Sequence, residues 1–468
     1  MAGCLSNLGV PDEMGCTSFV VLFIAVIAWM PASASAEAGT TSTSNKRPVS
    51  AEIGEFKKAL AEARPGDVLI LAPGTHKGPV SLDRSLTIDG QGRAEVAGNG
   101  KGSVITVTGA DIVIRNLKVV GSGSDHQPID SGIFIAEASA RTVVENNYVE
   151  GNLHGITVHG GKDTVVRANT VIGRQDHRLN DRGNGIYVWN APGTIIEGNK
   201  IRFGRDGIFS NYSKRNFFRG NVMQDLRFAV HYMYTNDSEV SGNVSIGNRL
   251  GFALMFSRNI TVKDNLSLRD RGHGIMLNYT NNSLVRGNLV RGGTHEKCAF
   301  IYNAHKNSIS GNRFEGCGVG IHFTAGSERN QISGNAFISN REQVKYVGTK
   351  FVEWSDEGRG NFWSDHPAFD LDGNGLADSK FKPNDLMDHI LWSQPAAMML
   401  LGSPAVQLMR WSQQAFPALM PGGVVDSHPL LKPVDIAVPE EVATLEHATR
   451  PDWLEGGTDA NLEAQSSH

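Results

Sequence analysis

The sequence predicts an all-β fold, a right-handed single-stranded parallel β-helix with coils of about 22 residues, an N-terminal cap helix and a C-terminal α-helical segment. Two recurring patterns carry this prediction. An Asn followed two residues later by an apolar residue returns at a spacing of about 22 residues, and a Gly-Ile-x-apolar anchor follows most of these Asn by about eight residues. The 53 glycines in 468 residues accompany many Asn, which is typical of a turn-rich β chain. The recurring residues are Asn116, Asn147, Asn169, Asn199, Asn221, Asn243, Asn265, Asn288, Asn312, Asn335 and Asn361.

Each repeat contains two or three short apolar strands separated by polar turns. Such a unit cannot bury its own apolar face, but it builds a continuous core when it stacks on its neighbours, with parallel strands about 4.8 Å apart. The recurring Asn are expected to tolerate left-handed backbone at a corner and to hydrogen-bond from coil to coil.

The N-terminal segment predicts a secretory signal peptide over residues 1–36. The apolar run from Phe19 to Met30 is too short to span a bilayer, and Ala34-Ser35-Ala36 forms a small-residue cleavage site. A retained anchor helix is the alternative. The remaining segments are expected to be a linker at 37–49, the capped β-helix at 50–360, a C-terminal cap and partner-docking segment at 361–433, and an acidic mobile tail at 434–468.

A helix is expected at the start of the β-helix, from Ser50 to Arg64. Ile53, Phe56 and Leu60 have helical spacing, and Pro65-Gly66 ends the pattern. Such a helix would cover the open end of the first coil, which is otherwise prone to aggregation.

The outward positions of the strands give the strongest functional signal. Alternation assigns the anchor Ile and the residue two positions later to the core, and the residues beside them to the outside. These outward positions carry aromatic, Met and His side chains rather than charged ones, which marks a contact surface or groove. Thioether and imidazole groups suit Cu(I), so the strip predicts a copper site. Its residues are His231, Met233, Met255, Met276 and His273. The alternative is that the Met residues pack beneath a covering loop and the His residues are solvated.

Three further features have more than one interpretation. Asp370, Asp372, Asn374 and Asp378 resemble the first part of a calcium loop, but Phe381 stands where a Glu is expected, so an Asx-rich turn is the alternative. Cys298 and Cys317 could pair, bind metal or stay buried. Two inserted loops, 121–130 and 173–182, each carry an Asp-His pair that could orient a ligand or lie at the surface.

Several function classes are disfavoured. With a net charge of −4, the chain has no excess of positive charge that would favour nucleic acid as a partner. The sequence also lacks a phosphate-binding Gly-rich motif, so the chain is not expected to bind ATP. Gly272-His273-Gly274 matches one element of a polygalacturonase site, without the adjacent Asp pair that the hydrolysis needs. The chain is therefore predicted not to be an enzyme, and a secreted polysaccharide lyase, epimerase or glycosidase, or an adhesion rod, is the alternative.

Five segments near the C-terminus are distinctive, namely 360–366 (Gly-Asn-Phe-Trp-Ser-Asp-His), 369–375, 383–386, 403–407 and 416–427. With these segments the chain resembles the NosD family, and the resemblance extends over about residues 48–433. It implies a periplasmic, copper-handling accessory protein. It also implies partners, namely an ABC transporter membrane subunit, a lipoprotein copper chaperone and nitrous oxide reductase, whose copper centres the family helps to assemble. The Met-rich segment 384–411, expected to form two short amphipathic helices, then becomes the candidate transporter contact.

Overall fold

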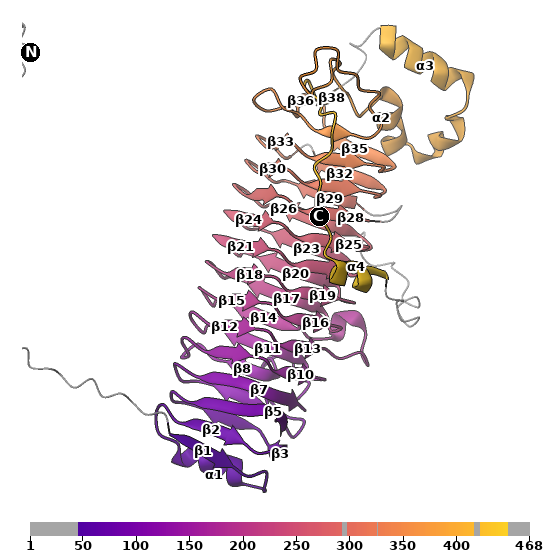
Figure 1. The fold of residues 1–468 in the computed structure, drawn as a ribbon. Coiled ribbons are helices and arrows are strands. Elements are labelled where there is room, and N and C mark those ends of the chain that lie inside the picture. The colour runs from indigo at the N-terminus through magenta and orange to yellow at the C-terminus, as the bar shows by residue number, and fades with distance from the viewer. Residues whose placement is uncertain (1–44, 293–296, 325, 416–421, 448–468) are drawn as a thin grey trace, which may run out of the picture. The chain divides into compact units, whose positions relative to one another are not determined.

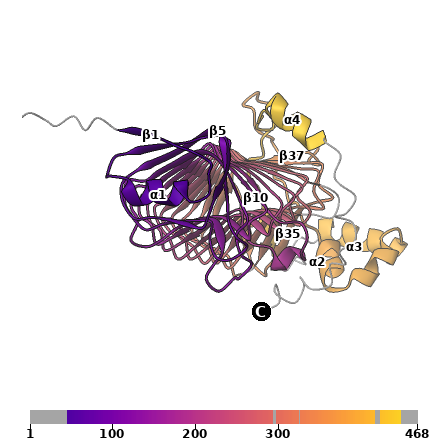
Figure 2. The ribbon, with the colours of Figure 1, turned by 90° about the horizontal axis from the view of Figure 1, so that it is seen from below.

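The computed structural model describes residues 45–292, 297–324, 326–415 and 422–447. It confirms the parallel β-helix: from β8 onward each coil adds one strand to each of three columns of parallel strands (Figure 1). Seen from below, the coils lie over one another around a shared interior (Figure 2). The first column, which carries the candidate site, contains β4 (Val80–Leu82), β6 (Ile105–Val107), β8 (Ser131–Ile135), β11 (His154–His159), β14 (Ile186–Trp189), β17 (Asp206–Asn211), β20 (Phe228–Met233), β23 (Leu250–Met255), β26 (His273–Asn278), β29 (Lys297–Tyr302), β32 (Val319–Thr324) and β35 (Glu342–Val347).

The other two columns complete the coils. The second contains β9 (Val143–Glu145), β12 (Val165–Arg167), β15 (Ile195–Glu197), β18 (Phe217–Arg219), β21 (Ser238–Ser241), β24 (Ile260–Lys263), β27 (Leu284–Arg286), β30 (Ser308–Ser310) and β33 (Gln331–Ser333). The third contains β10 (Tyr148–Glu150), β13 (Thr170–Ile172), β16 (Lys200–Arg202), β19 (Val222–Gln224), β22 (Val244–Ile246), β25 (Leu266–Leu268), β28 (Leu289–Arg291), β31 (Arg313–Glu315), β34 (Ala336–Ile338) and β37 (Phe362–Trp363). The first coils use β1 (Lys46–Val49), β2 (Val68–Leu71), β3 (Gly74–Lys77), β5 (Thr87–Ala97) and β7 (Val113–Val120).

The interior is filled by the side chains that alternation assigns to it. The anchor positions are at most 2% exposed, so the predicted inward direction of this column is confirmed. Burying each of these aliphatic or aromatic side chains contributes roughly 1.5–3 kcal/mol. The anchor residues are Ile133, Ile156, Ile186, Ile208, Val230, Phe252, Ile275, Ala299 and Ile321.

A buried Asn ladder links the coils, as expected. From Asn147 to Asn335, each ladder Asn donates its backbone N–H, over 2.9–3.0 Å, to the Oδ1 of the next Asn along the stack, and the series ends at Asn361. The expected left-handed backbone falls mostly on the preceding residue, with φ of 60° at Gly220 and 61° at Gly242, and not on the ladder Asn. The ladder side chain is directed into the stack, so the residue before it makes the sharp turn that needs positive φ.

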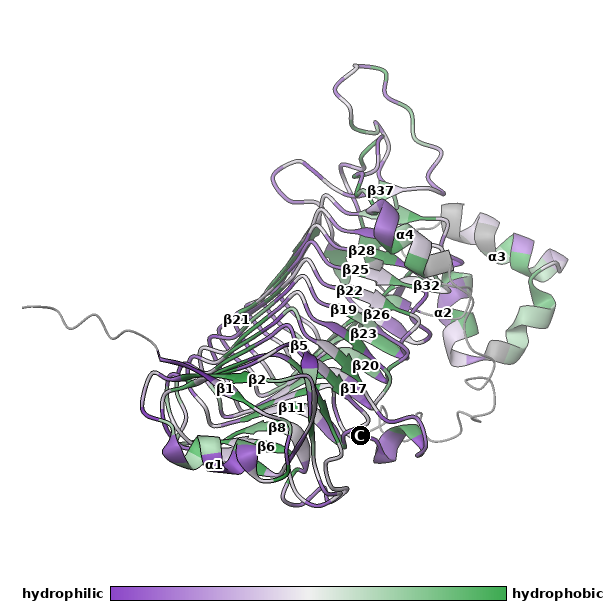
Figure 3. Cartoon of the chain, turned by 60° about the horizontal axis from the view of Figure 1, so that its bottom comes forward, coloured by the Kyte–Doolittle hydropathy of each residue, from purple (hydrophilic) through white to green (hydrophobic). Residues whose placement is uncertain are grey.

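The N-terminal cap is shorter than expected. Helix α1 spans Glu55–Glu62 and buries Phe56, which contacts His76 edge-on at 5.7 Å. Ile53 lies before the helix and is 88% exposed, so it does not belong to the packed face. Residues 46–49 of the expected linker form β1, whose backbone pairs with β2 and extends the sheet. Hydropathy along α1 alternates between hydrophilic and hydrophobic residues, as a surface helix requires (Figure 3).

The C-terminal segment closes the other end of the stack. Asp426 is fully buried and accepts hydrogen bonds from the Asn361 N–H (2.7 Å) and the Trp363 Nε1–H (2.8 Å). Burial raises the pKa of Asp426, although these hydrogen bonds oppose the shift. Strand β36 (Phe351–Glu353) pairs with β38 (Gly423–Val425). Two α-helices, α2 (Leu386–Ser393) and α3 (Pro404–Ala415), flank a 3₁₀ turn at Pro395–Leu400, so the expected pair of short helices is present.

The first part of the acidic tail contains a helix that the sequence did not predict. Helix α4 (Glu440–His447) places Val442 against an apolar patch on the third column, together with Ile436 and Val438. Covering the patch removes exposed aliphatic surface from water, which favours this arrangement. The patch consists of Val244, Ile246, Leu266, Leu268 and Leu289. The expected signal peptide and residues 448–468 lie outside the described residues.

Two remaining expectations concern covalent and membrane features. Cys298 and Cys317 form a disulfide with a Cα–Cα distance of 5.7 Å, which settles the state that the sequence left open. Within the described ranges, none of the helices combines the length and the apolar character needed to cross a membrane.

Candidate metal centre

The predicted copper residues lie on three adjacent strands of the first column, β20, β23 and β26. The register places His231 beside Ala253 and Ala253 beside Met276, and it places Met233 beside Met255. His273 begins β26 and lies beside Leu250. With neighbouring coils about 4.8 Å apart, three coils bring these side chains onto one outer face. We call His231, Met233, Met255, Met276 and His273 the Met/His strip.

The strip is reachable from solvent, although not uniformly. Met233, Met255, Met276 and His273 are half-buried rather than enclosed in the core. His231 is only 7% exposed, because Phe209 stacks on its ring at 4.7 Å and Phe228 contacts it edge-on at 4.6 Å. Alternation therefore assigned the correct face, but it did not show how much the neighbouring rings cover His231.

A buried carboxylate orients His231. Asp206 Oδ2 lies 3.2 Å from His231 Nδ1, and Asp206 also accepts two hydrogen bonds from Arg227, at 2.8 and 2.7 Å. Burial alone would raise the pKa of Asp206, but the hydrogen bonds from His231 and Arg227 hold it well below its usual range. With Asp206 ionised, a neutral His231 donates its Nδ1–H to this carboxylate, and the lone pair is then on Nε2.

The second nitrogen of His231 is available for a ligand. Nε2 is buried and has no hydrogen-bond partner in the part of the chain that the structure describes. A carboxylate that fixes one imidazole nitrogen while the other stays free is the arrangement found around metal-ligating His residues.

Ala253 lies between His231 and Met276 in the register of the first column, and it is fully buried. The same position carries the large side chains of Phe209 in β17 and Phe300 in β29. The small methyl group of Ala253 therefore lies between His231 and Met276, which are two coils apart. Met233 and Met255 lie beside each other, two residues further along β20 and β23 than His231 and Ala253.

His273 marks the C-terminal edge of the strip. Burial, with a smaller contribution from the nearby Lys297, lowers its pKa to about 4, so the ring is neutral at neutral pH and can act as a ligand. Its Nδ1 is buried without a partner among the described residues. The ammonium of Lys297 disfavours a cation at this end, so the geometry centres the site on His231 and the three Met residues.

The donor set of the strip is soft. Three thioethers and a neutral imidazole suit Cu⁺, and they discriminate against hard cations that prefer oxygen ligands. Over the described ranges, no group of three or more His, Cys, Asp or Glu residues gathers as a metal site. Metal binding at the strip would therefore depend on its Met residues.

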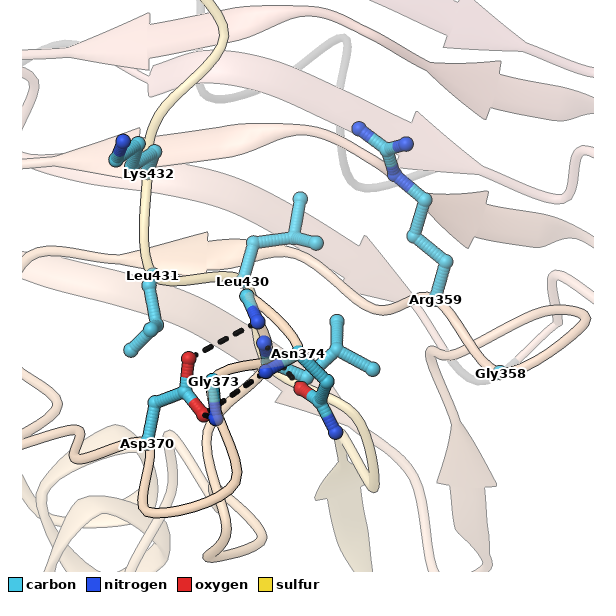
Figure 4. A pocket seen from close by; sticks show the side chains of 10 residues that line it. Gly358, Arg359, Asp370, Gly373, Asn374, Leu430, Leu431 and Lys432 are labelled. Carbon is cyan, nitrogen blue, oxygen red and sulfur yellow. Dashed lines mark hydrogen bonds between the residues drawn. The ribbon is translucent and has the colours of Figure 1, made fainter.

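The possible calcium loop is not supported. Asp370 accepts backbone hydrogen bonds from Gly373, Asn374 and Gly375, of which the Gly375 bond is the main cause of the lowered pKa of Asp370 (Figure 4). Asp378 likewise accepts the Leu371 N–H at 2.7 Å. Asn374 Oδ1 accepts the backbone N–H of Leu376, and the Asp372 carboxylate accepts both the backbone N–H and the Nδ2–H of Asn374. These oxygens serve the loop itself, which is the Asx-rich turn of the alternative interpretation. A pocket beside it is lined by Arg359, Leu430, Leu431 and Lys432.

The two inserted loops bind each other. Arg174 donates to Ser124 Oγ at 2.7 Å and to the Gly123 carbonyl at 2.9 Å, and His126 Nε2 lies 3.1 Å from the Asp181 carbonyl. Asp125 caps the Gln127 N–H, and Asp176 lies 3.5 Å from His177. The Asp side chains therefore serve the local loop structure, and none of the contacts described here directs them at the Met/His strip.

The carboxylates near Gly272-His273-Gly274 do not form a hydrolytic pair. Asp270 is buried inside the stack, where Ser245 and Ser267 donate to it at 2.6 and 2.7 Å. Asp264 is exposed at the corner between β24 and β25, away from the first column. The acid and base of a glycosidase would have to face one bond, and these two do not.

Sequence reasoning missed two features around the strip. The first is the group formed by Asp206 and Arg227, which come from different coils. The second is an exposed column of aromatic rings, Tyr212, Tyr234, Phe256 and Tyr279. Its signal was present in the sequence, because in four successive coils an aromatic residue directly follows the second outward position.

Comparison with known proteins provides independent evidence. A family model described as periplasmic copper-binding protein (NosD) matches residues 169–368. Two proteins named probable ABC transporter binding protein NosD are each 39% identical to this chain. The one from Stutzerimonas stutzeri aligns over 375 residues, 77% of this chain and 86% of that protein, and the one from Pseudomonas aeruginosa over 374 residues, 77% and 87%.

Solved structures are more distant. The DFA-IIIase of Arthrobacter chlorophenolicus without its lid is 18% identical with a TM-score of 0.45, covering 62% of this chain and 89% of that one. The A-module of the Azotobacter vinelandii mannuronan C-5 epimerase AlgE6 is 14% identical with a TM-score of 0.44, with the same coverage. Likeness at this level says nothing about activity. The relatives at 39% identity, aligned over most of both chains, establish that the chain belongs to the NosD family of periplasmic proteins.

Proposed function

We propose that this chain binds Cu⁺ at the Met/His strip and hands it on during the assembly of the copper centres of nitrous oxide reductase. The observation that carries the proposal is the free Nε2 of His231, oriented by Asp206 beside three thioethers. The description of the matching family model as copper-binding supports it. In this role the chain is a binding protein and not an enzyme, in keeping with the names of its relatives.

Loading the strip requires a protein that donates Cu⁺ to it, and the names of the relatives suggest a membrane partner. A lipoprotein copper chaperone is the proposed donor of Cu⁺, and an ABC transporter is the proposed membrane partner. Cargo ions enter and leave an open strip more readily than an enclosed cage, and half-buried Met residues provide such access.

Removal of two thioethers tests the site. Met233→Ala/Met255→Ala is expected to weaken Cu⁺ binding by at least about tenfold, because the imidazole of His231 and the one remaining thioether, Met276, cannot complete a soft coordination shell. Anaerobic competition against a chromophoric Cu⁺ chelator measures the affinity. Met398→Ala/Met399→Ala is the matched control, since it removes two exposed thioethers outside the strip. Equal affinities for the wild type and the strip variant would exclude the strip as the binding site.

The C-terminal helices are the proposed transporter contact. Helix α3 exposes Leu408 and Trp411, three residues apart and therefore on one face. Met398 and Met399, in the 3₁₀ turn that precedes α3, are also exposed. An aromatic and aliphatic face of this kind is suited to packing against a membrane subunit.

Polar substitution on α3 should remove transporter binding. Leu408→Ser/Trp411→Ser is expected to reduce co-purification with the transporter by about tenfold or more, with the β-helix intact because both side chains are exposed. Far-UV circular dichroism checks the fold, and Tyr148→Ser is the control for loss of an exposed aromatic side chain. Undiminished co-purification of the α3 variant would place the contact elsewhere.

A further inference from the structure

An exposed ladder of aromatic rings runs beside the Met/His strip. Tyr212, Tyr234, Phe256 and Tyr279 follow β17, β20, β23 and β26, and they stack at centroid distances of 4.8, 5.2 and 5.2 Å with interplanar angles of 10–19°. They are 36–58% exposed. We call these four residues the aromatic ladder.

The ladder uses a backbone conformation that bulky residues rarely adopt. All four residues are left-handed, with φ between 49° and 52°. A side chain with a Cβ is disfavoured in this region, and Asn tolerates it best among non-glycine residues. Asn190 and Asn303 occupy the same corner in the coils before and after the ladder, with φ of 46° and 44°. Strained residues of this kind gather at functional surfaces.

The exposed part of the ladder consists of ring edges. Each inner ring has both faces covered by its neighbours, so a sugar ring has no platform on which to stack. Ring edges instead contact protein side chains, and the thioether of Met makes favourable contacts at the edge of an aromatic ring. The geometry therefore favours a protein partner that presents Met residues over a polysaccharide.

The ladder is continuous with the proposed copper site. Tyr234 and Phe256 directly follow Met233 and Met255 in the chain, and the Tyr234 N–H donates to the Met255 carbonyl at 3.2 Å. A protein resting on these ring edges would bring its own metal ligands next to the thioethers of the strip.

The turn beyond the ladder is positively charged. Lys214, Arg215, Arg258 and Lys306 are exposed there, and none of them forms an ion pair within the described ranges. The register places Lys214 beside Asn236, and Arg258 beside Asn281, along one side of the ladder. Asp237 and Glu328 are acidic residues in the same series of turns: Asp237 accepts a hydrogen bond from Asn259, and the Lys306 N–H donates to the Glu328 carbonyl. Unpaired cations along one side of a contact surface attract carboxylates and steer association.

We propose that the aromatic ladder is the docking surface for the protein that delivers Cu⁺ to the strip, a partner whose contact surface carries Met side chains at its centre and carboxylates at its rim. The proposal rests on the function proposed above, because it assumes that copper is exchanged at the strip. It assigns the ladder to docking and the strip to the ion, so the two can be tested separately.

The variant Tyr234→Asn/Phe256→Asn tests docking. Asn fits the left-handed backbone and is already present at this corner in neighbouring coils, so the fold should persist. The probe is the purified lipoprotein copper chaperone of the same host, without its lipid anchor. The variant is expected to bind the copper-free chaperone at least about tenfold more weakly by biolayer interferometry, and to receive Cu⁺ from the loaded chaperone correspondingly more slowly. Its affinity for free Cu⁺ should match that of the wild type.

Two controls separate the possible outcomes. Tyr148→Asn removes an exposed aromatic side chain on β10 and should leave chaperone binding unchanged. Lys214→Glu/Arg258→Glu should weaken binding most at low ionic strength, since salt screens exposed charges. Lower thermal stability of the ladder variant with undiminished chaperone binding would show that the ladder is only structural, and would overturn the proposal. The strip variant could retain its Cu⁺ affinity while the ladder variant no longer binds the chaperone. That result would contradict the copper site at the strip and would support the aromatic ladder as the docking surface.

Discussion

Replacing Asn265 by Ala is expected to lower the free energy of unfolding by about 3–5 kcal/mol, because it breaks the ladder in mid-stack. Asn265 Oδ1 accepts both the N–H and the Nδ2–H of Asn243, and its own Nδ2 donates to the Val240 carbonyl and to Asn288 Oδ1, all at 2.9–3.0 Å. The site is fully buried, so water cannot replace these partners. Urea-induced unfolding followed by circular dichroism measures the loss.

Thr261→Ala provides the comparison for Asn265→Ala. Thr261 lies on β24 of the same coil with a half-buried, outward side chain, and its replacement should cost under about 1 kcal/mol. A loss of similar size in both variants would mean that the ladder hydrogen bonds contribute little beyond ordinary strand propensity. Because coils contact only their neighbours, the break could also split unfolding into two transitions, one for each side of the stack.

Replacing Asp270 by Asn is expected to stabilise the protein by roughly 2–3 kcal/mol above pH 6, and to have little effect near pH 4. Burial raises the pKa of Asp270 to about 6, against partial opposition from the hydroxyls of Ser245 and Ser267 and the Asn248 N–H. The folded protein therefore retains a proton that the unfolded chain has released between pH 4 and 6. The free energy of unfolding of the wild type therefore falls as pH rises from 4 to 6. The uncharged amide of the Asp270→Asn variant removes this pH dependence.

Asn248 makes the converse change possible. It occupies the same position one coil earlier, where its Nδ2 donates to Ser245 Oγ and to the Met223 carbonyl. Asn248→Asp should therefore add a second loss of stability above pH 6. Unfolding midpoints between pH 4 and 8 for the wild type and both variants measure these effects. Midpoints of Asp270→Asn and wild type that differ by a constant amount across this range would contradict the raised pKa.

Much of the fold followed from spacing alone. The repeat of about 22 residues gave the parallel β-helix, and alternation gave the inward direction of residues such as Ile208 and Val230. The same alternation directed Met233 and Met255 outward, as the structure has them. These features depend on local periodicity and on the need to bury one face of each strand. Both can be recognised from the pattern of apolar and polar residues along a short stretch of sequence.

The candidate site was only partly accessible to such reasoning. Its residue types could be read from the sequence, but the bond between Asp206 and His231 joins residues from adjacent coils. How far Phe209 and Phe228 cover His231 depends on side-chain conformations that periodicity does not specify. The helix α4 was missed for a related reason, since the apolar patch that Val442 covers is assembled from three coils.

The sequence by itself determined the architecture, the core and the face on which sulfur and imidazole groups gather. Only the tertiary structure decided that Cys298 pairs with Cys317, that Asp206 fixes His231, and that the Asp370 loop uses its oxygens for its own backbone. The physical reason is the separation along the chain between the residues that interact. Strand direction and burial follow from neighbouring residues, whereas a disulfide, a buried hydrogen bond or a metal site needs atoms from separate coils to meet within a few ångströms.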